Sequence, residues 1–156
     1  MGHRSAVDVF LLLRHEDRVL FALRRDTGYA DGQWNLPSGK VEPDEHGLAA
    51  IVRESAEEIG LRCSPDELSP AWTLHYRPPG GDARIGLFFA LTWDPDRHGT
   101  PVNAEPHKCG GIGWYPLDRP PAPLEPYTRA GLALHRSGAG FGIAGWERGK
   151  SVGGPG

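Results

Sequence analysis

The segment from Gly39 to Leu61 constrains the fold and chemistry of this chain more than any other part of the sequence. A polar loop, Ser38–Glu45, leads into a helical pattern over His46–Ile59. The apolar residues that repeat at the i, i+3, i+4 spacing of one helix face are Leu48, Ile51 and Val52. Gly60 follows directly and is placed to form the C-cap. The segment therefore predicts a tight loop followed by a capped helix that packs on a core.

The same helix carries three carboxylates, Glu54, Glu57 and Glu58, on an arc about 100° wide. Like charges at i, i+3 and i, i+4 repel by a few tenths of a kcal/mol per pair. A solvated acidic face would explain such a cluster. A hard divalent cation such as Mg²⁺, which takes carboxylate and phosphate oxygens, would also explain it. In that case the metal could screen a polyphosphate and activate a water molecule for attack on phosphorus.

Two further residues favour the metal site over the solvated face. Glu45 lies at the start of the helix, where a carboxylate complements the N-terminal dipole and the free N–H groups. Arg53 stands four residues before Glu57, so its guanidinium can hold that carboxylate by a charge-assisted hydrogen bond. Together with the turn at Gly39, these residues complete a candidate site.

The rest of the chain alternates short β-type runs with loops rich in Gly and Pro. The predicted strands are Val7–Leu13, Val19–Leu23, Trp34–Leu36, Ala71–Tyr76, Arg84–Trp93 and Ile112–Tyr115. The first two form a hairpin and Arg84–Trp93 is central, while Asp94–Glu105 is a polar loop. A second helix is predicted over Pro126–Arg136, and Phe141–Trp146 is expected to pack back on the domain. Strands flanked by two helices favour an α/β fold, with a mixed sheet covered by helices on both faces.

Length and charge narrow the classes of function. The 156 residues fit one domain, expected over 1–150, with a flexible tail over 151–156. The net charge of −3, without a basic run, argues against binding a nucleic acid polymer. No apolar stretch reaches the length of a membrane span, and no secretory signal is seen. Cys63 and Cys109 are far apart in no metal-ligand spacing, which favours reduced thiols and a cytoplasmic protein.

The segment as a whole resembles the signature of the Nudix (MutT-like) hydrolases, G-x5-E-x7-R-E-U-x-E-E-x-G-U, where U is bulky and aliphatic. In this chain it reads Gly39-x5-Glu45-x7-Arg53-Glu54-Ser55-Ala56-Glu57-Glu58-Ile59-Gly60-Leu61. All seven fixed letters are present, a match that arises by chance on the order of a few times per billion positions. The chain departs from the usual pattern in having Ser55 at an aliphatic position, and Asp44 and Ser38 where Gly is common.

The resemblance implies a fold, a cofactor and a set of roles. The fold is the α/β/α sandwich of that family, with a mixed, curved sheet flanked by helices, covering about Val7 to Trp146. The cofactor is Mg²⁺ or Mn²⁺. The implied metal ligands are Gly39 (through its carbonyl), Glu54, Glu57 and Glu58. The implied catalytic residues are Glu54, Arg53, Glu45 and Glu105, with Glu105 and Glu54 as the alternative general bases.

Candidate substrate-binding residues lie before this segment. Arg24 and Arg25 end a predicted strand, where a guanidinium can bind phosphate in a bidentate manner. Trp34 can stack on a base, and the amide of Asn35 can hydrogen-bond to a purine edge. Each also has a plain structural explanation, as a solvated strand end or a core side chain.

Three functions remain open at this stage. The first is hydrolysis of a diphosphate linkage in a nucleoside triphosphate or related small nucleotide. The second is hydrolysis of another diphosphate, such as ADP-ribose, a nucleotide sugar or a prenyl diphosphate. The third is a non-catalytic ligand-binding module, which the complete set of carboxylates disfavours. The expected partner is a small diphosphate, with no nucleic acid polymer and no membrane, and the pattern leaves a homodimer open.

Overall fold

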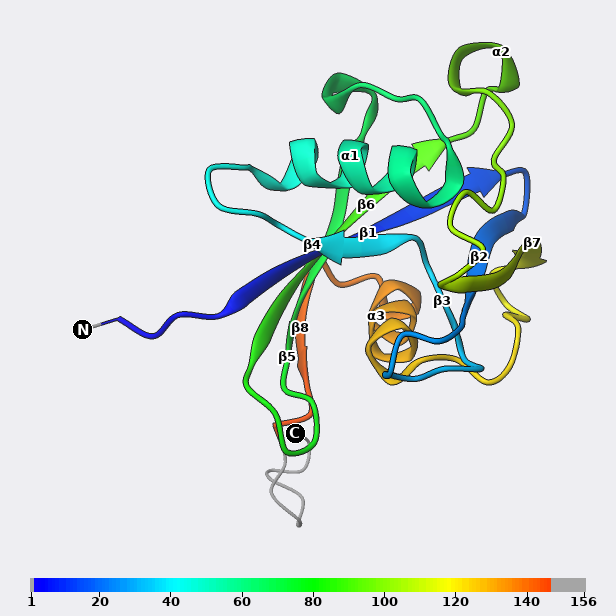
Figure 1. Cartoon of the computed structure of the whole chain (residues 1–156). Coiled ribbons are helices and arrows are strands. Elements are labelled where there is room, and N and C mark those ends of the chain that lie inside the picture. Colours follow the sequence, from blue (N-terminus) through cyan, green and yellow to red (C-terminus); the bar gives the residue numbers. More distant parts are fainter. Residues whose placement is uncertain (1, 147–156) are drawn as a thin grey trace.

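The computed structural model describes residues 2–146, which form one mixed sheet with a helix against each face (Figure 1). The strands are β1 (Ala6–His15), β2 (Arg18–Arg24), β3 (Trp34–Asn35), β4 (Ser38–Lys40), β5 (Ser69–Tyr76), β6 (Arg84–Thr92), β7 (Cys109–Pro116) and β8 (Phe141–Ala144). The helices are α1 (Gly47–Ile59), the 3₁₀ turn η1 (Pro65–Glu67), α2 (Pro95–His98) and α3 (Pro126–Ser137). The predicted α/β class is confirmed.

The strand order is β3-β2-β1-β6-β5-β8, with β4 added on β1 and β7 added on β2. Strand β1 runs parallel to β6 over nine residue pairs, from Ala6↔Arg84 to Arg14↔Thr92. These two apolar strands lie in the middle of the sheet, as predicted for Arg84–Trp93. The parallel pairing brings together residues more than seventy positions apart.

Alternation along β1 divides the core between the two faces of the sheet. Val9, Leu11 and Leu13 are buried on the α1 side, together with Ile51 of the helix. Phe10 is buried on the opposite side, where Leu132 of α3 belongs to the same cluster. The sheet thus has a core on each face, which confirms the expected sandwich.

Strands β1 and β2 separate soon after their hairpin. They pair only at Arg14↔Val19 and His15↔Arg18. Further along β1, strand β4 takes the place of β2, pairing from Asp8↔Lys40 to Phe10↔Ser38. The prediction that Ser38–Glu45 is a loop throughout was therefore wrong for Ser38–Lys40. Ser and Gly favour turns, but pairing with a buried strand outweighs that local preference here.

Helix α1 has the predicted end and a different start. Gly60 caps its C-terminus in the left-handed conformation, with φ 66°. At the N-terminus the cap is His46, whose imidazole accepts the Ala49 N–H. Glu45 was expected to complement the free N–H groups at the helix start, but its carboxylate accepts the N–H of Glu42 and pairs with Arg53 instead.

Smaller differences concern the second half of the chain. The loop predicted over Asp94–Glu105 contains the short helix α2, whose first turn is capped by the Asp94 side chain. Strand β7 starts at Cys109, three residues before the predicted Ile112, because it pairs with β2 through a register shift. The Phe141–Trp146 segment does pack on the domain, through β8 parallel to β5. The tail predicted over 151–156 lies outside the described residues.

Within residues 2–146, no helix combines the length and the apolar character needed to cross a membrane.

Candidate active site

A cavity of about 620 Å³ lies where β1 and β4 part from β2. One part of its wall carries the carboxylates of Glu54, Glu58 and Glu105, together with the backbone of β4. Another part carries charged and aromatic side chains from β1, β6 and α3. The cavity therefore joins the acidic face of α1 to a second, chemically distinct wall.

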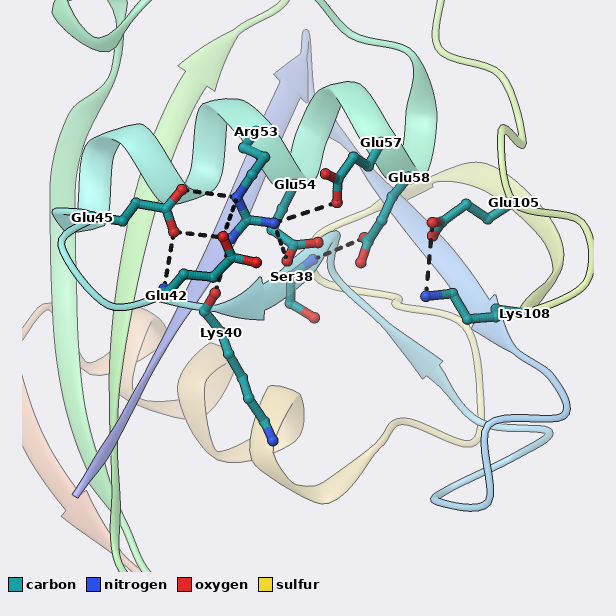
Figure 2. A network of polar contacts seen from close by, with 10 residues as sticks. All are labelled: Ser38, Lys40, Glu42, Glu45, Arg53, Glu54, Glu57, Glu58, Glu105 and Lys108. Carbon is teal, nitrogen blue, oxygen red and sulfur yellow. Dashed lines mark hydrogen bonds and ion pairs between the residues drawn. The ribbon is translucent and has the colours of Figure 1, made fainter. Parts of the chain in front are cut away.

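Arg53 is the centre of a network on α1 (Figure 2). Its Nε and Nη2 donate to the two oxygens of Glu45 at 2.8 and 3.0 Å. Its Nη1 donates to Glu54 at 3.0 Å and to Glu57 at 3.3 Å, the i, i+4 contact expected from the sequence. Nη2 also donates to the Lys40 carbonyl at 3.0 Å. The Arg53 guanidinium, with the Glu42 N–H, lowers the pKa of Glu45 to about 2. One guanidinium thus ties the loop, strand β4 and two helix carboxylates together.

Glu54 packs directly against Gly39 of β4. A Cβ atom on Gly39 would overlap the Glu54 carboxyl group, so only glycine leaves room for it. Burial raises the pKa of Glu54 and the charges of Glu57 and Glu105 add to this, while Arg53 opposes it. The glycine at the start of the motif therefore sets the approach of a half-buried carboxylate to the β4 backbone.

Glu58 lies one turn further along α1 and accepts a hydrogen bond from the Ser38 N–H at 3.1 Å. Burial raises the pKa of its carboxyl to about 8, and the nearby charges of Glu54 and Glu105 act in the same direction. These three carboxylates therefore lie close enough to repel one another.

Glu105 comes from the loop after α2 and reaches the same cavity wall. Its loop is held to the end of α1 by the Ala104 N–H, which donates to the Glu58 carbonyl at 3.1 Å. The Lys108 ammonium lies 3.7 Å from the Glu105 carboxylate, and Lys108 also lines the cavity (Figure 2). The structure thus brings Glu105 to the cavity wall that carries Glu54 and Glu58, and its role in catalysis stays a prediction.

These residues fit a divalent cation in their chemistry. Glu54, Glu58 and Glu105 are hard oxygen donors whose mutual repulsion a cation would relieve. Among residues 2–146, however, no set of three His, Cys, Asp or Glu side chains is grouped closely enough to hold a metal ion. The carboxylates of Glu54 and Glu57 are each paired with the Arg53 guanidinium, and Glu57 does not line the cavity. The donors therefore share a cavity wall without converging on one point.

Of the four predicted substrate-binding residues, the structure brings Arg24 and Asn35 to the cavity. Arg24 donates to the Tyr29 carbonyl at 2.7 Å and to Thr27 Oγ1 at 3.0 Å, and so holds the loop after β2. The Asn35 amide, in the orientation that satisfies both partners, donates to the Ala22 carbonyl and accepts from Arg24 Nη1, each at 3.1 Å. Both side chains already have partners within the protein.

The other two residues do not reach the cavity wall in the described part of the chain. Arg25 is largely exposed and lies 3.5 Å from the Asp26 carboxylate. Trp34 packs edge-on against Tyr115, with ring centroids 5.4 Å apart, in the cluster under α3.

Comparison with known proteins agrees with this geometry. The family model of the NUDIX domain matches residues 2–134. The chain belongs to the Nudix family. Over 132 residues it is 30% identical to the CTP pyrophosphohydrolase of Escherichia coli (strain K12), a match that covers 81% of this chain and 90% of that protein. Over 80 residues it is 35% identical to human 8-oxo-dGDP phosphatase NUDT18, covering 46% of this chain but only 24% of that protein.

The fold gives the same result. The crystal structure of the MutT NUDIX hydrolase from Burkholderia pseudomallei superposes with a TM-score of 0.74 at 25% identity, covering 84% of this chain and 98% of that chain. The chain is thus a Nudix hydrolase, an enzyme that acts on phosphorus anhydrides of nucleotide-type substrates.

Sequence reasoning missed several residues of this Nudix cavity. Asp8 lies within the apolar run of β1, and Arg84 opens β6, where the pattern showed only a strand. Tyr127 was assigned to a helical pattern. A carboxylate inside a buried strand is the one signal that could have marked this group, because such a charge needs a partner.

Proposed function

We propose that this Nudix hydrolase cleaves a diphosphate linkage in a nucleoside triphosphate with Mg²⁺ or Mn²⁺. The observation that carries the proposal is that one cavity is lined both by the carboxylates of Glu54, Glu58 and Glu105 and by a second wall of charged and aromatic side chains. A small nucleotide carries a polyphosphate and a base, and the two walls suit these two parts. The similarity to a CTP pyrophosphohydrolase over 90% of its length supports this substrate class.

The proposed metal ligands at the cavity wall are Glu54, Glu58 and the Gly39 carbonyl. Glu57, which the resemblance adds to this set, lies outside the lining, where Arg53 holds it beside Glu54. When bound, the cation screens the polyphosphate and lowers the pKa of a water molecule for attack on phosphorus. Arg53 holds Glu45, Glu54 and Glu57 in place through its hydrogen bonds.

The proton of the attacking water passes to a carboxylate as the new O–P bond forms and the anhydride P–O bond breaks. Glu105 is our candidate acceptor, because it lines the cavity outside the Arg53 network. Glu54 is the alternative, although one of its oxygens accepts from Arg53. Lys108 lines the same wall, where its ammonium can pair with a phosphate oxygen.

The free thiols of Cys63 and Cys109 support the cytoplasmic setting expected from the sequence.

The test is an assay of phosphate and pyrophosphate release from a nucleotide panel, with Mg²⁺, with Mn²⁺ and with a chelator. Wild type is compared with Glu57→Gln and Glu58→Gln, which keep the shape of the side chain and remove its charge. Glu16→Gln in the β1–β2 turn, away from the cavity, is the matched control. We expect turnover only with metal and a large loss in both site variants. Equal activity in the site variants would refute the ligand assignment, and no turnover by wild type would favour a binding module.

A further inference from the structure

The second wall of the cavity contains a paired arginine and carboxylate. Arg84 Nε donates to Asp8 Oδ2 and Arg84 Nη2 donates to Asp8 Oδ1, each at 2.7 Å. Asp8 is only 6% exposed, whereas the Arg84 side chain is 27% exposed. Two parallel hydrogen bonds fix the plane of a guanidinium more tightly than a single ion pair does. Arg84 is therefore held in one orientation at the cavity surface.

Helix α3 reinforces this pair from the face of the sheet on which Asp8 lies. The Tyr127 hydroxyl donates to Asp8 Oδ2 at 3.0 Å, and its ring stacks on Tyr76 at 4.4 Å. Gly86 of β6 makes room for it, because a Cβ there would lie 2.8 Å from the Tyr127 oxygen. Asp8 thus accepts three hydrogen bonds, and its orientation is fixed independently of any ligand.

This arrangement leaves one edge of Arg84 unused. A guanidinium has five N–H donors, and Asp8 takes one from Nε and one from Nη2. The remaining N–H groups, on Nη1 and Nη2, form the end of the planar group, and no described residue accepts from them. Arg84 lines the cavity. Two adjacent coplanar donors are therefore offered to whatever occupies this part of it.

Two acceptor chemistries match such a pair of donors, a phosphate and the edge of a base. The charge of Arg84 is already balanced by Asp8, and the buried carboxylate of Glu125 lines the same cavity, so an anion gains little there. Lys108, Lys40 and Arg24 offer positive charge elsewhere on the lining. The neutral edge of a base is the better match for Arg84.

We propose that Arg84 recognises the nucleobase of the substrate and selects bases that present two adjacent acceptors in one plane. Guanine does so with O6 and N7, the pair that arginine binds in nucleic acids. Cytosine does so with O2 and N3. In adenine, N1 and N7 each lie next to the 6-amino group, which is a donor. In uracil, the donor N3–H lies between the two carbonyl oxygens. Each of these bases therefore meets Arg84 with a donor. 8-Oxoguanine carries a hydrogen on N7 and loses the guanine pair. This inference rests on the proposed function and specifies its substrate class.

The experiment measures kcat/KM of wild type for CTP, GTP, ATP and UTP, which carry the same triphosphate group and differ in the base. We expect the better of CTP and GTP to exceed ATP and UTP by about 10- to 100-fold, the discrimination of a good bidentate contact. 7-Deaza-GTP and 8-oxo-dGTP, in which N7 is no longer an acceptor, test whether the acceptor pair is guanine O6 and N7 or cytosine O2 and N3. If guanine binds through O6 and N7, both analogues fall to the level of ATP. If cytosine is the substrate, CTP is preferred and the guanine series stays low throughout.

Arg84→Lys keeps the charge and removes the planar donor pair, so we expect the base preference to fall to a few-fold. Tyr127→Phe keeps the arginine and removes one support of Asp8, so we expect a smaller loss, with base preference still above that of Arg84→Lys. Thermal melting reports whether each variant is folded, and Tyr127→Phe carries the test if Arg84→Lys is not. Arg97→Lys, at a surface ion pair with Glu67, is the matched control and should keep the wild-type preference.

The outcomes separate this inference from the proposed function. An Arg84→Lys variant that loses all four substrates equally would show a phosphate contact and overturn the inference, as would a wild type without base preference. If wild type hydrolyses none of them, the proposed function fails. Calorimetric titration with CMP, GMP, AMP and UMP, which contain no anhydride, then tests base recognition alone. Tighter binding of CMP or GMP would support the inference, and equal binding of all four would overturn it.

Discussion

Arg53 donates two hydrogen bonds to the carboxylate of Glu45, which lies eight residues earlier in the chain, at 2.8 and 3.0 Å. The same guanidinium reaches Glu54, Glu57 and the Lys40 carbonyl. A lysine offers one compact charge and cannot span these acceptors. In the Nudix motif of this chain, the arginine therefore positions the carboxylates on two elements at once.

We expect Arg53→Lys to lower kcat by about 10- to 100-fold, because displaced carboxylates misalign the reacting groups. The KM should change less, since Arg53 does not line the cavity. Steady-state kinetics on the best nucleotide measures both, with Arg62→Lys as a control outside this network. An unchanged kcat would show that the network is not needed for catalysis.

Gly39→Ala tests the close approach of β4 and α1. The added methyl group must displace the Glu54 carboxyl group or push the strand away. We expect a loss of about 1 to 3 kcal/mol in the free energy of unfolding, and a fall in kcat of more than tenfold because Glu54 moves. Gly140→Ala, where a Cβ meets nothing within 4 Å, is the control and should be close to neutral. Denaturant unfolding and kinetics on both variants decide the matter, and wild-type behaviour of Gly39→Ala would contradict the contact.

Ser55 gives a prediction of the opposite sign. It is fully buried on α1 at a position that is usually aliphatic in the family, and its hydroxyl has no hydrogen-bond partner among the described residues. Removing an unpaired buried polar group relieves its desolvation cost. We expect Ser55→Ala to raise the free energy of unfolding by about 1 kcal/mol, without a change in kcat. Destabilisation in a denaturant titration would mean that the hydroxyl has a partner.

Local patterns predicted α1 well, whereas contacts distant in the chain were missed. The end of the helix at Gly60 follows from the chain itself, because the cap needs only a residue that adopts positive φ. Strand β4 forms by pairing with Asp8–Phe10, about thirty positions earlier in the chain, so local residue propensities do not predict it. The same holds for the second wall of the cavity, since Asp8 and Arg84 meet only through the parallel pairing of β1 with β6.

The candidate site shows the same division. The motif identified the carboxylates of α1, and the structure places Glu105 beside them. The sequence did not indicate that the side chains of Asn35 and Arg24 hydrogen-bond to each other, because this contact depends on how β2 pairs with β3. Nor could it separate Arg24 from Arg25, because their environments are set by the loop after β2.

The acid stability of the protein should depend on Glu67. The Ser64 N–H and then His98 lower the pKa of Glu67 to about 2, from an ordinary value of 4.5. A lowered folded-state pKa adds stability that is complete above about pH 4.5 and is lost as the pH falls toward 2. We expect Glu67→Gln to be less stable than wild type at pH 7, and the difference to shrink between pH 4.5 and 2. Denaturant titrations across this range test it, with Glu16→Gln as a control. A constant difference down to pH 2 would exclude this linkage.

Glu105→Gln tests the proposed proton acceptor most directly. The loop of Glu105 is held by its backbone, since the Lys108 and Cys109 N–H groups both donate to the Glu105 carbonyl, at 2.8 and 2.9 Å. Replacing the carboxylate by an amide should therefore leave the loop in place and remove only a base. Loss of a general base costs about 10²- to 10⁴-fold in rate, so kcat should fall far more than KM rises.

Two comparisons complete this test. Lys108→Met removes the cation 3.7 Å from Glu105 and leaves the base, so we expect a weaker effect on kcat and a larger one on KM. In Glu105→Gln the acidic limb of the kcat–pH profile should also change, because the titrating acceptor is gone. If kcat and its pH profile match those of wild type, Glu105 is not the base, and Glu54, the other carboxylate proposed for this role, becomes the residue to test.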